Sequence, residues 1–210
     1  MIAVLDYGIG NLRSAEKALQ RVGGDAVLTA DVALASAADG VVLPGVGAFG
    51  RCMDRLQASG LDKVVLGAVE RGTPLLGICV GMQMLYDGSD ENPGVAGLGV
   101  LPGTLHLLPE GVKRPQMQWN RLDPVAVASR GSAECPLLAG LGAEPWVYFV
   151  HSYAAPWSDD VVAACEYGEA VVAAVARGCV WATQFHPEKS GPVGLQLLAN
   201  FAQRCAPASP

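Results

Sequence analysis

This sequence has no long apolar run, although its composition is strongly hydrophobic. Hydrophobic residues make up 51% of the 210 residues, and the mean hydropathy is +0.31. A membrane-spanning helix needs about 20 consecutive apolar residues, whereas stretches such as "AVVAAVA" at 170–176 are much shorter. We therefore expect no membrane partner. The hydrophobicity is better explained by a buried sheet, most simply a parallel one with helices on both faces.

Clusters of basic residues are also missing. Lys and Arg total 14 against 20 Asp and Glu, which gives a net charge of −6. A chain of this charge is a poor candidate for binding nucleic acid or an anionic membrane surface. The N-terminal "MIAVLDYGIG" has no basic segment and reaches Asp6 early, so we expect no signal peptide and a cytoplasmic location.

Cysteine and histidine occur without the spacings that metal sites and small disulfide frameworks use. The six cysteines (52, 79, 135, 165, 179 and 205) form no C-x-x-C pair, so we expect reduced thiols and neither a metal nor a cofactor. The sequence has only three histidines, His106, His151 and His186. Any histidine chemistry must therefore come from one of these three.

Strand and helix patterns alternate in the first half of the chain. Short apolar strands are predicted at 2–6, 25–29, 40–47 and 73–79, and helices at 12–23, from 31, 48–60, 61–72 and 80–88. Such alternation is typical of βαβ units. It predicts a doubly wound, mostly parallel α/β sheet.

The second half follows a different pattern. Residues 88–120 are rich in Gly and Pro and predict short strands at best. Successive strands are predicted at 145–154 and 161–185, with turns near Gly168 and Gly178, followed by a closing helix at 192–205. No repeat, low-complexity segment or linker stands out. We therefore predict a single domain over 1–206 and a frayed tail at 207–210.

The stretch "GICVG" at 77–81 places Cys79 between two glycines at a predicted strand-to-helix junction. This is the cysteine form of a nucleophile elbow, in which small neighbours allow a strained, sharp turn. The positive end of the following helix would favour a thiolate. The alternative is a small buried hydrophobic residue. From this pentapeptide alone the two interpretations are equally good.

A cysteine nucleophile needs a base and a group that orients it. The segment "TQFHPEKSG" at 183–191 supplies His186 and Glu188, directly after a predicted strand. Pro187 restricts His186 to an extended backbone. An incidental ion pair on a surface loop is the alternative, and it would be preferred for this segment alone. Together with Cys79 on an α/β chain, the catalytic interpretation is favoured.

Acyl transfer also requires donors for a developing oxyanion. The N–H of Val80, directly after the cysteine, is one candidate. A second is the loop "LPGVGAF" at 43–49, where Gly45 and Gly47 allow close approach of the backbone to a ligand. An ordinary strand-to-helix turn remains the alternative for this loop.

Taken together, "PGVGAF", "GICVGMQ" and "QFHPEKSG" resemble the class I (triad) glutamine amidotransferases over nearly the whole chain. The resemblance implies a flavodoxin-like α/β fold and hydrolysis of L-glutamine through a thioester. It implies a catalytic triad of Cys79, His186 and Glu188. The further residues it implies are backbone oxyanion donors at Val46, Gly47 and Val80, and glutamine contacts at Gly47, Gln83, His151, Ser152 and Tyr153. For His151 a structural role beside the pocket is equally expected.

Other segments narrow the resemblance within the family. "LDYGIGNLRS", "VHSY" and "HPEKSGPVGLQLLANF" are similar to the glutaminase subunits of imidazole glycerol phosphate synthase. That similarity implies histidine biosynthesis and a heterodimer in which a (β/α)8-barrel cyclase receives the ammonia. Candidates for facing this partner are Asn11, Met117, Gln118, Trp119 and Asn120.

The chain departs from the family at "MQWN" (117–120), where Gln118 replaces the usual glycine in a segment that resembles a partner-facing loop. Three alternatives remain. One is a glutaminase that serves another synthase, such as anthranilate synthase. The second is a cysteine hydrolase of another class on the same fold, and the third is a binding module without activity.

Overall fold

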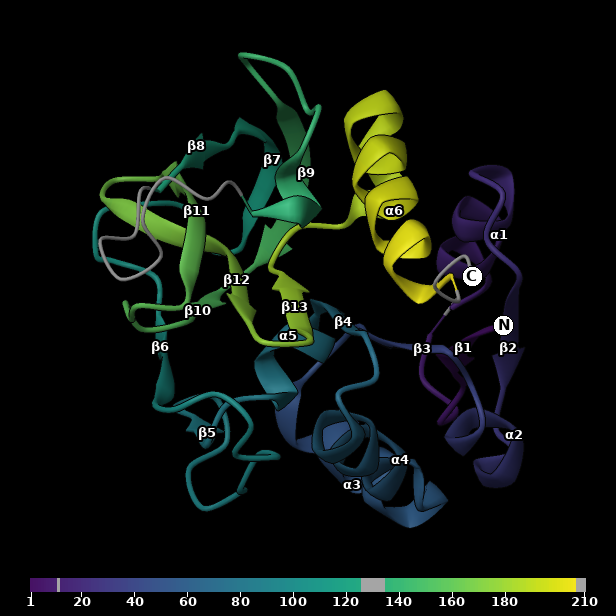
Figure 1. Cartoon of the computed structure of the whole chain (residues 1–210). Helices are drawn as coiled ribbons and strands as arrows, with labels where there is room; N and C mark the ends of the chain where they lie inside the picture. The colour runs from purple at the N-terminus through teal and green to yellow at the C-terminus, as the bar shows by residue number, and fades with distance from the viewer. Residues whose placement is uncertain (11, 126–134, 207–210) are drawn as a thin grey trace.

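The computed structural model describes residues 1–10, 12–125 and 135–206. Within them, one eight-stranded sheet has the order β2-β1-β3-β4-β13-β12-β11-β8 (Figure 1). Parallel pairing joins β2 (Ala26–Thr29), β1 (Ile2–Leu5), β3 (Gly40–Gly45), β4 (Leu75–Cys79) and β13 (Val180–Thr183). Antiparallel pairing adds β12 (Ala170–Arg177), β11 (Val161–Glu166) and β8 (Asp123–Pro124). The predicted mostly parallel sheet is confirmed.

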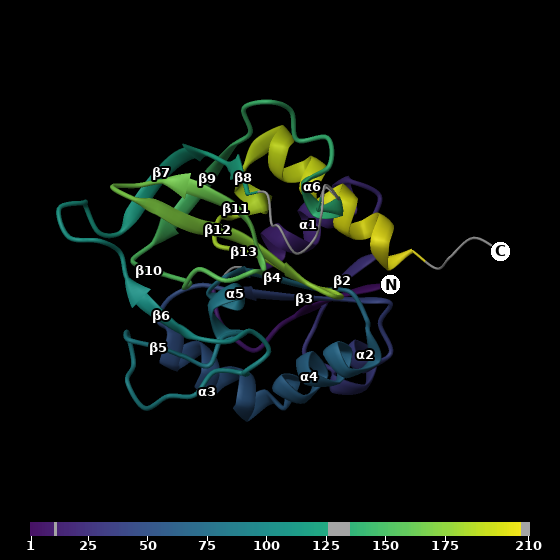
Figure 2. The same ribbon diagram turned by 60° about the vertical axis from the view of Figure 1, so that its left-hand side comes forward.

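Helices cover both faces of this sheet, as predicted. Figure 2 shows α1 (Arg13–Arg21) and α6 (Gly191–Cys205) on one face, and α2 (Val32–Ser36), α3 (Phe49–Ser59) and α4 (Leu61–Arg71) on the other. The Asp31 carboxylate accepts hydrogen bonds from the first N–H groups of α2. Helix α3 ends at Gly60, whose φ of +74° favours glycine. No helix in the described ranges is long and apolar enough to cross a bilayer.

Two smaller sheets differ from the predictions. Strand β7 (Gln116–Arg121) pairs antiparallel with β9 (Trp146–His151), and β10 (Tyr153–Ala154) joins β6 (Thr104–Leu107) and β5 (Gly88–Ser89). The single strand predicted over 145–154 is therefore wrong, because it divides at Ser152 between two sheets. Residues 117–120 form part of a six-residue strand and not a loop. The strand forms because β9, distant in sequence, pairs along its whole length, with the Trp119 and Tyr148 ring centroids 6.3 Å apart.

The remaining elements are short. Helix α5 covers only Val80–Met84, so the helix predicted to continue to 88 ends early. The chain turns after Tyr86 to enter β5. Among the described residues, the 3-10 helix η2 (Pro136–Leu138) lies before β9, and η3 (Pro187–Lys189) lies before α6.

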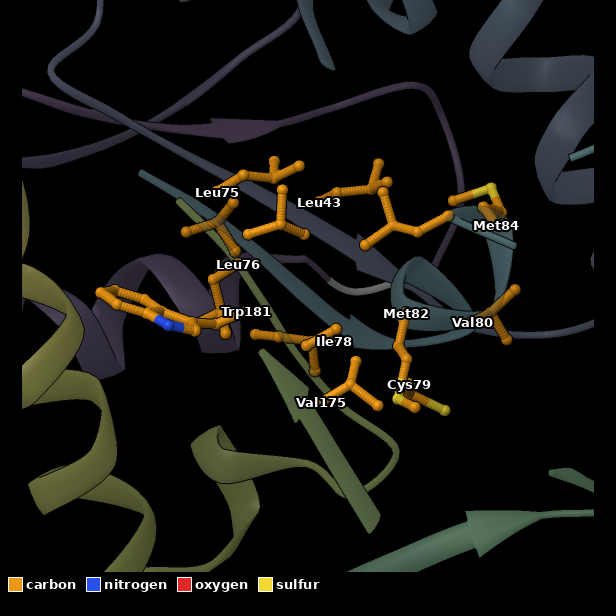
Figure 3. Packing of buried hydrophobic residues seen from close by; sticks show 14 of the residues in the cluster. Leu43, Leu75, Leu76, Ile78, Cys79, Val80, Met82, Met84, Val175 and Trp181 are labelled. Carbon is orange, nitrogen blue, oxygen red and sulfur yellow. The ribbon is translucent and has the colours of Figure 1, made fainter. Parts of the chain in front are cut away.

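The hydrophobic core runs along β3, β4 and β13. Figure 3 shows buried apolar side chains such as Leu75, Leu76 and Ile78 along β4, with Cys79 at the end of the row beside α5. Burying each large aliphatic side chain contributes about 1.5–3 kcal/mol. The core therefore fixes the end of β4, where Cys79 lies.

Candidate active site

Cys79 occupies a strained elbow between β4 and α5. Its φ of +55° and ψ of −114° make it the one non-glycine residue with positive φ among the described residues. Such a conformation costs about 1–3 kcal/mol. A Cβ at Gly81 would collide with the carbonyl oxygen of Leu43, and one at Gly77 would lie 3.0 Å from the backbone of Met82. The predicted need for both elbow glycines is borne out by these contacts.

His186 and Glu188 form a buried pair directly beyond β13. His186 Nδ1 lies 2.7 Å from Glu188 Oε1, and the two side chains are only 2% and 6% exposed. Strands β13 and β4 are parallel neighbours, with Thr183 opposite Ile78. The residues after both strands consequently meet at one edge of the sheet. This topology is why a cysteine and a histidine 107 residues apart in sequence come together.

Ser190, which was not among the predicted site residues, fixes the backbone around His186. Its hydroxyl donates to the His186 carbonyl at 2.6 Å and accepts from the N–H of Tyr148 at 3.0 Å. The His186 N–H donates to the Tyr148 carbonyl at 3.0 Å. These bonds tie η3 to β9, so the imidazole has a defined position.

The surroundings of His186 favour its charged form. Burial alone would lower the pKa of His186, but the neighbouring Cys79 and Glu188 side chains raise it to about 9. Glu188 engages Nδ1, and no described residue makes a hydrogen bond with Nε2. Nε2 is therefore the nitrogen that remains for proton exchange with Cys79.

The loop after β3 is held from behind by α3. The Cys52 thiol donates to the Val46 carbonyl, with the sulfur 3.4 Å from the oxygen. Because the peptide is planar and trans, the N–H of Gly47 points the opposite way, away from α3. Gly47 has a φ of +94°, which favours glycine.

Two side chains from the segment after β5, one carboxylate and one amide, cap the start of α3, the helix that follows the β3 loop. Glu91 Oε2 accepts from the N–H of Phe49 at 2.8 Å, and Asn92 Oδ1 accepts from the N–H of Gly50 at 2.9 Å. The N-cap residue itself, Ala48, supplies no side-chain bond. Long-range capping of α3 therefore fixes the position of the adjoining loop.

These groups surround a cavity of about 410 Å³, a volume within the usual range of small-molecule sites. The predicted residues that line it are Val46, Gly47, Cys79, Val80, Gln83, His151, Ser152, Tyr153 and His186. Glu188 lies behind His186. Residues that line the cavity and that sequence reasoning missed are Glu91, Pro115, Val150 and Lys189. Of these four, only Glu91 and Lys189 have charged side chains. Neither lies in a sequence motif that distinguishes it from the other charged residues of the chain.

Gln83 offers the cavity an acceptor and no donor. Its Nε2 donates to the Tyr153 carbonyl at 3.2 Å and to Gln184 Oε1 at 3.0 Å. A primary amide has two N–H groups, so both are engaged. Only the amide oxygen of Gln83 remains, and it suits an ammonium group better than a carboxylate.

His151 is a buried, neutral support. Burial lowers the pKa of His151 to about 4. Nδ1 lies 2.9 Å from the Tyr153 carbonyl oxygen, and Nε2 lies 2.9 Å from the side-chain amide of Gln116. With both nitrogens engaged by the protein, the geometry favours the structural role over direct ligand contact.

The predicted partner-facing residues lie outside the cavity, on β7. Met117 and Trp119 are 61% and 49% exposed, Gln118 is also exposed, and Asn120 is half-buried and donates to the Glu166 carbonyl at 2.8 Å. Asn11, the fifth candidate, lies outside the described residues, as does the tail predicted at 207–210. Over the described ranges, no group of three or more His, Cys, Asp and Glu side chains is placed to hold a metal ion.

The arrangement supplies the parts that acyl transfer by a thiol requires. A thiol at a helix start, an imidazole with a carboxylate on its far nitrogen, and a glycine loop meet at one cavity. This set can form a thiolate, attack a carbonyl carbon and stabilise the resulting oxyanion.

Comparisons with known proteins agree with this chemistry. The family glutamine amidotransferase class-I matches residues 3–205. "Imidazole glycerol phosphate synthase subunit HisH" of Methanothermobacter thermautotrophicus is 48% identical, over 97% of this chain and 98% of that protein. The protein of the same name from Geobacillus kaustophilus is 49% identical, over 96% of this chain and 95% of its own length.

Solved structures show the same fold. A glutamine amidotransferase superimposes with a TM-score of 0.74 at 22% identity, covering 97% of this chain and 98% of that one. A chain in the structure of PurLQS from Thermotoga maritima gives a TM-score of 0.66 at 20% identity, covering 96% of this chain and 97% of that one. With the family match over nearly its whole length, this chain belongs to the class I glutamine amidotransferases.

Proposed function

We propose that this chain is the glutaminase subunit of imidazole glycerol phosphate synthase. It hydrolyses L-glutamine to glutamate and ammonia and passes the ammonia to a cyclase subunit in histidine biosynthesis, in the cytoplasm. The observation that carries the proposal is the buried pair of His186 and Glu188 beside the strained Cys79, with Cys79 and His186 lining one cavity. Relatives named as subunits of that synthase, similar over nearly the whole chain, support this partner over others in the family.

The first half-reaction transfers the glutamyl group to sulfur. His186 Nε2 takes the proton from Cys79, while Glu188 holds the proton on Nδ1 and stabilises the imidazolium. The sulfur attacks the side-chain carboxamide of glutamine. The N–H of Val80 and the Val46–Gly47 loop receive the oxyanion, and one such donor contributes about 3–4 kcal/mol. His186 then protonates the departing nitrogen, and ammonia leaves a glutamyl thioester.

The second half-reaction restores the enzyme. His186, now neutral, takes a proton from water as the water attacks the thioester carbon. The collapsing intermediate releases glutamate, and the proton returns to the Cys79 sulfur. The pKa of His186, near 9, suits both the protonation of a departing amine and the storage of the thiol proton.

The cavity offers complementary groups to the amino-acid part of glutamine. The Glu91 carboxylate and the free amide oxygen of Gln83 suit the α-ammonium group. The Ser152 hydroxyl and the backbone near Gly47 and Tyr153 remain the proposed contacts for the α-carboxylate. Glu91 also accepts from the N–H of Phe49, so substrate binding and the start of α3 share one carboxylate.

The exposed face of β7 is the proposed docking surface for the barrel cyclase in a heterodimer. Met117 and Trp119 present apolar side chains to solvent there, and exposed aromatic and methionine side chains are typical of interface cores. Gln118, Asn120 and Asn11 are proposed to contribute around them. A closed interface would keep ammonia unprotonated by excluding water.

Ammonia release from glutamine, measured for the purified chain with and without the cyclase subunit, tests the function. We expect low activity from the chain alone and a rise on adding the cyclase subunit with its nucleotide ligand. Cys79→Ala should reduce hydrolysis to background while the variant still binds the cyclase. Hydrolysis at the wild-type rate in that variant would exclude Cys79 as nucleophile. Co-purification with a chorismate-using subunit, and no binding of a cyclase, would reassign the partner.

A further inference from the structure

Gln184 is a buried polar residue that the mechanism above does not use. It lies two residues before His186, and its side chain is 0% exposed. Its Nε2 lies 3.8 Å from Cys79 Sγ, and its Oε1 lies 3.0 Å from Gln83 Nε2. Buried side-chain amides normally have hydrogen-bond partners, so the orientation of the Gln184 amide decides whether its nitrogen or its oxygen faces the sulfur.

A chain of hydrogen bonds fixes which way the Gln184 amide points. The Tyr153 carbonyl can only accept, so the Gln83 nitrogen must face it, at 3.2 Å. The second hydrogen of that nitrogen reaches Gln184, which must therefore present its oxygen. The Gln184 nitrogen is left to face the Cys79 sulfur. A backbone carbonyl thus determines, through two side chains, that a donor points at the sulfur.

In its thiol form, Cys79 has a second neighbour with the opposite preference. Cys79 Sγ donates to the Val150 carbonyl, with the sulfur 3.8 Å from the oxygen. That carbonyl stabilises the thiol, because it accepts the S–H, and it repels a thiolate. An N–H donor does the reverse, since hydrogen bonds to an ionised acceptor are about twice as strong as those to a neutral one. Gln184 is the side-chain amide that can offset the carbonyl once the proton has moved to His186.

We propose that Gln184 is a catalytic residue that donates a hydrogen bond to the Cys79 sulfur and stabilises its thiolate. The proton passes from Sγ to His186 Nε2, and Gln184 neither gains nor loses one. This inference rests on the proposed function only in taking Cys79 as the nucleophile. Gln83 also positions this donor, because its side-chain nitrogen donates to the Gln184 oxygen.

The test measures how fast Cys79 reacts with iodoacetamide over a range of pH, in the full-length chain, with the labelled site identified by mass spectrometry. Gln184→Met removes the donor and keeps a similar volume. We expect alkylation at pH 7 to slow about tenfold, as the loss of one charge-assisted hydrogen bond predicts, and the pH profile to move upward. The matched control is Gln196→Met, at an exposed glutamine of α6, which should react like wild type. For glutamine hydrolysis, measured with the cyclase subunit present, kcat should fall by a similar factor.

A second variant keeps the proposal testable if Gln184→Met does not fold. Gln184→Glu keeps the side-chain length and an acceptor for Gln83, and its ionised form places a negative charge beside the sulfur. Alkylation at alkaline pH should then slow by more than tenfold relative to wild type. A wild-type rate and pH profile in either folded variant would overturn the proposal. The reagent does not need glutamine to react. A wild-type chain that fails to hydrolyse glutamine even with the cyclase subunit and its nucleotide ligand present, yet shows this dependence on Gln184, would therefore refute the proposed function and leave the present inference standing.

Discussion

Replacing Glu188 with glutamine tests the role of the buried carboxylate, and the structure gives a magnitude for the effect. The Glu188 carboxylate and Nδ1 of His186 are 2.7 Å apart, with both side chains almost fully buried. A hydrogen bond to a charged group contributes about 1.5–3 kcal/mol. If that energy stabilises the imidazolium during catalysis, Glu188→Gln should lower kcat about 10- to 150-fold. KM should change little, since Glu188 does not line the cavity.

The same variant has a spectroscopic signature, because the chain has only three histidines. NMR titration of the imidazole rings should show His186 with a pKa near 9 and His151 with one near 4 in the wild type. Removing the carboxylate leaves burial less opposed, so the pKa of His186 should fall in Glu188→Gln. The pKa of His151 is lowered mainly by its own burial, so it should change little, and His151 is the internal control. An unchanged His186 titration together with wild-type kcat would refute the reasoning.

The raised pKa of His186 also predicts how the free energy of unfolding depends on pH. The folded-state pKa of His186 lies above its ordinary value of 6.5. Its contribution to stability is therefore complete below pH 6.5 and is lost as the pH rises from 6.5 through 9. In Glu188→Gln this loss should become smaller. Urea unfolding at pH 6 and pH 9.5, for both proteins, measures the difference.

Two further predictions concern the elbow and the docking surface. Gly81→Ala should lower the free energy of unfolding by about 3 kcal/mol, because its Cβ would overlap the Leu43 carbonyl oxygen, a backbone atom that cannot move aside. Gly67→Ala in α4, where the new Cβ meets only the flexible end of Arg71, is the matched control and should be neutral or stabilising in urea unfolding. Trp119→Ala should weaken cyclase binding about tenfold or more by calorimetry, whereas Trp157→Ala, at an equally exposed tryptophan outside β7 and β9, should not. Equal effects from the two tryptophan variants would exclude β7 as the docking surface.

The fold was predictable where local pattern and topology agree. Alternating strands and helices in the first half, and the glycine turns at 168 and 178, indicate the observed elements, and both glycines have positive φ. Strand β7 was not predictable, because its stability comes from pairing with β9 and not from its own composition. The split of 145–154 at Ser152 likewise depends on which strands the two halves meet.

In the site, too, residues were predictable where local sequence determines them and not where distant contacts do. Cys79, His186 and Glu188 were predictable because their chemistry resides in side chains at the ends of two recognisable strands. Val150 was not, because it contributes a backbone carbonyl, which any residue has. Gln184 was visible within "TQFHPEKSG", but its contact with the sulfur depends on a partner about 100 residues away. Glu91 reaches the cavity through the fold of a loop whose composition indicates only a turn.

The pairing of β7 with β9 connects the proposed docking surface to a backbone carbonyl that contacts the reacting sulfur. Met117, at the exposed surface, lies directly opposite Val150, whose carbonyl holds the Cys79 thiol proton. A partner that shifts β7 cannot leave β9 in place, since ladder bonds tolerate only small changes in length. In the proposed complex, movement of β7 on docking would therefore shift the carbonyl that accepts the Cys79 S–H. The strand pair is then a short structural connection between the proposed docking surface and the nucleophile.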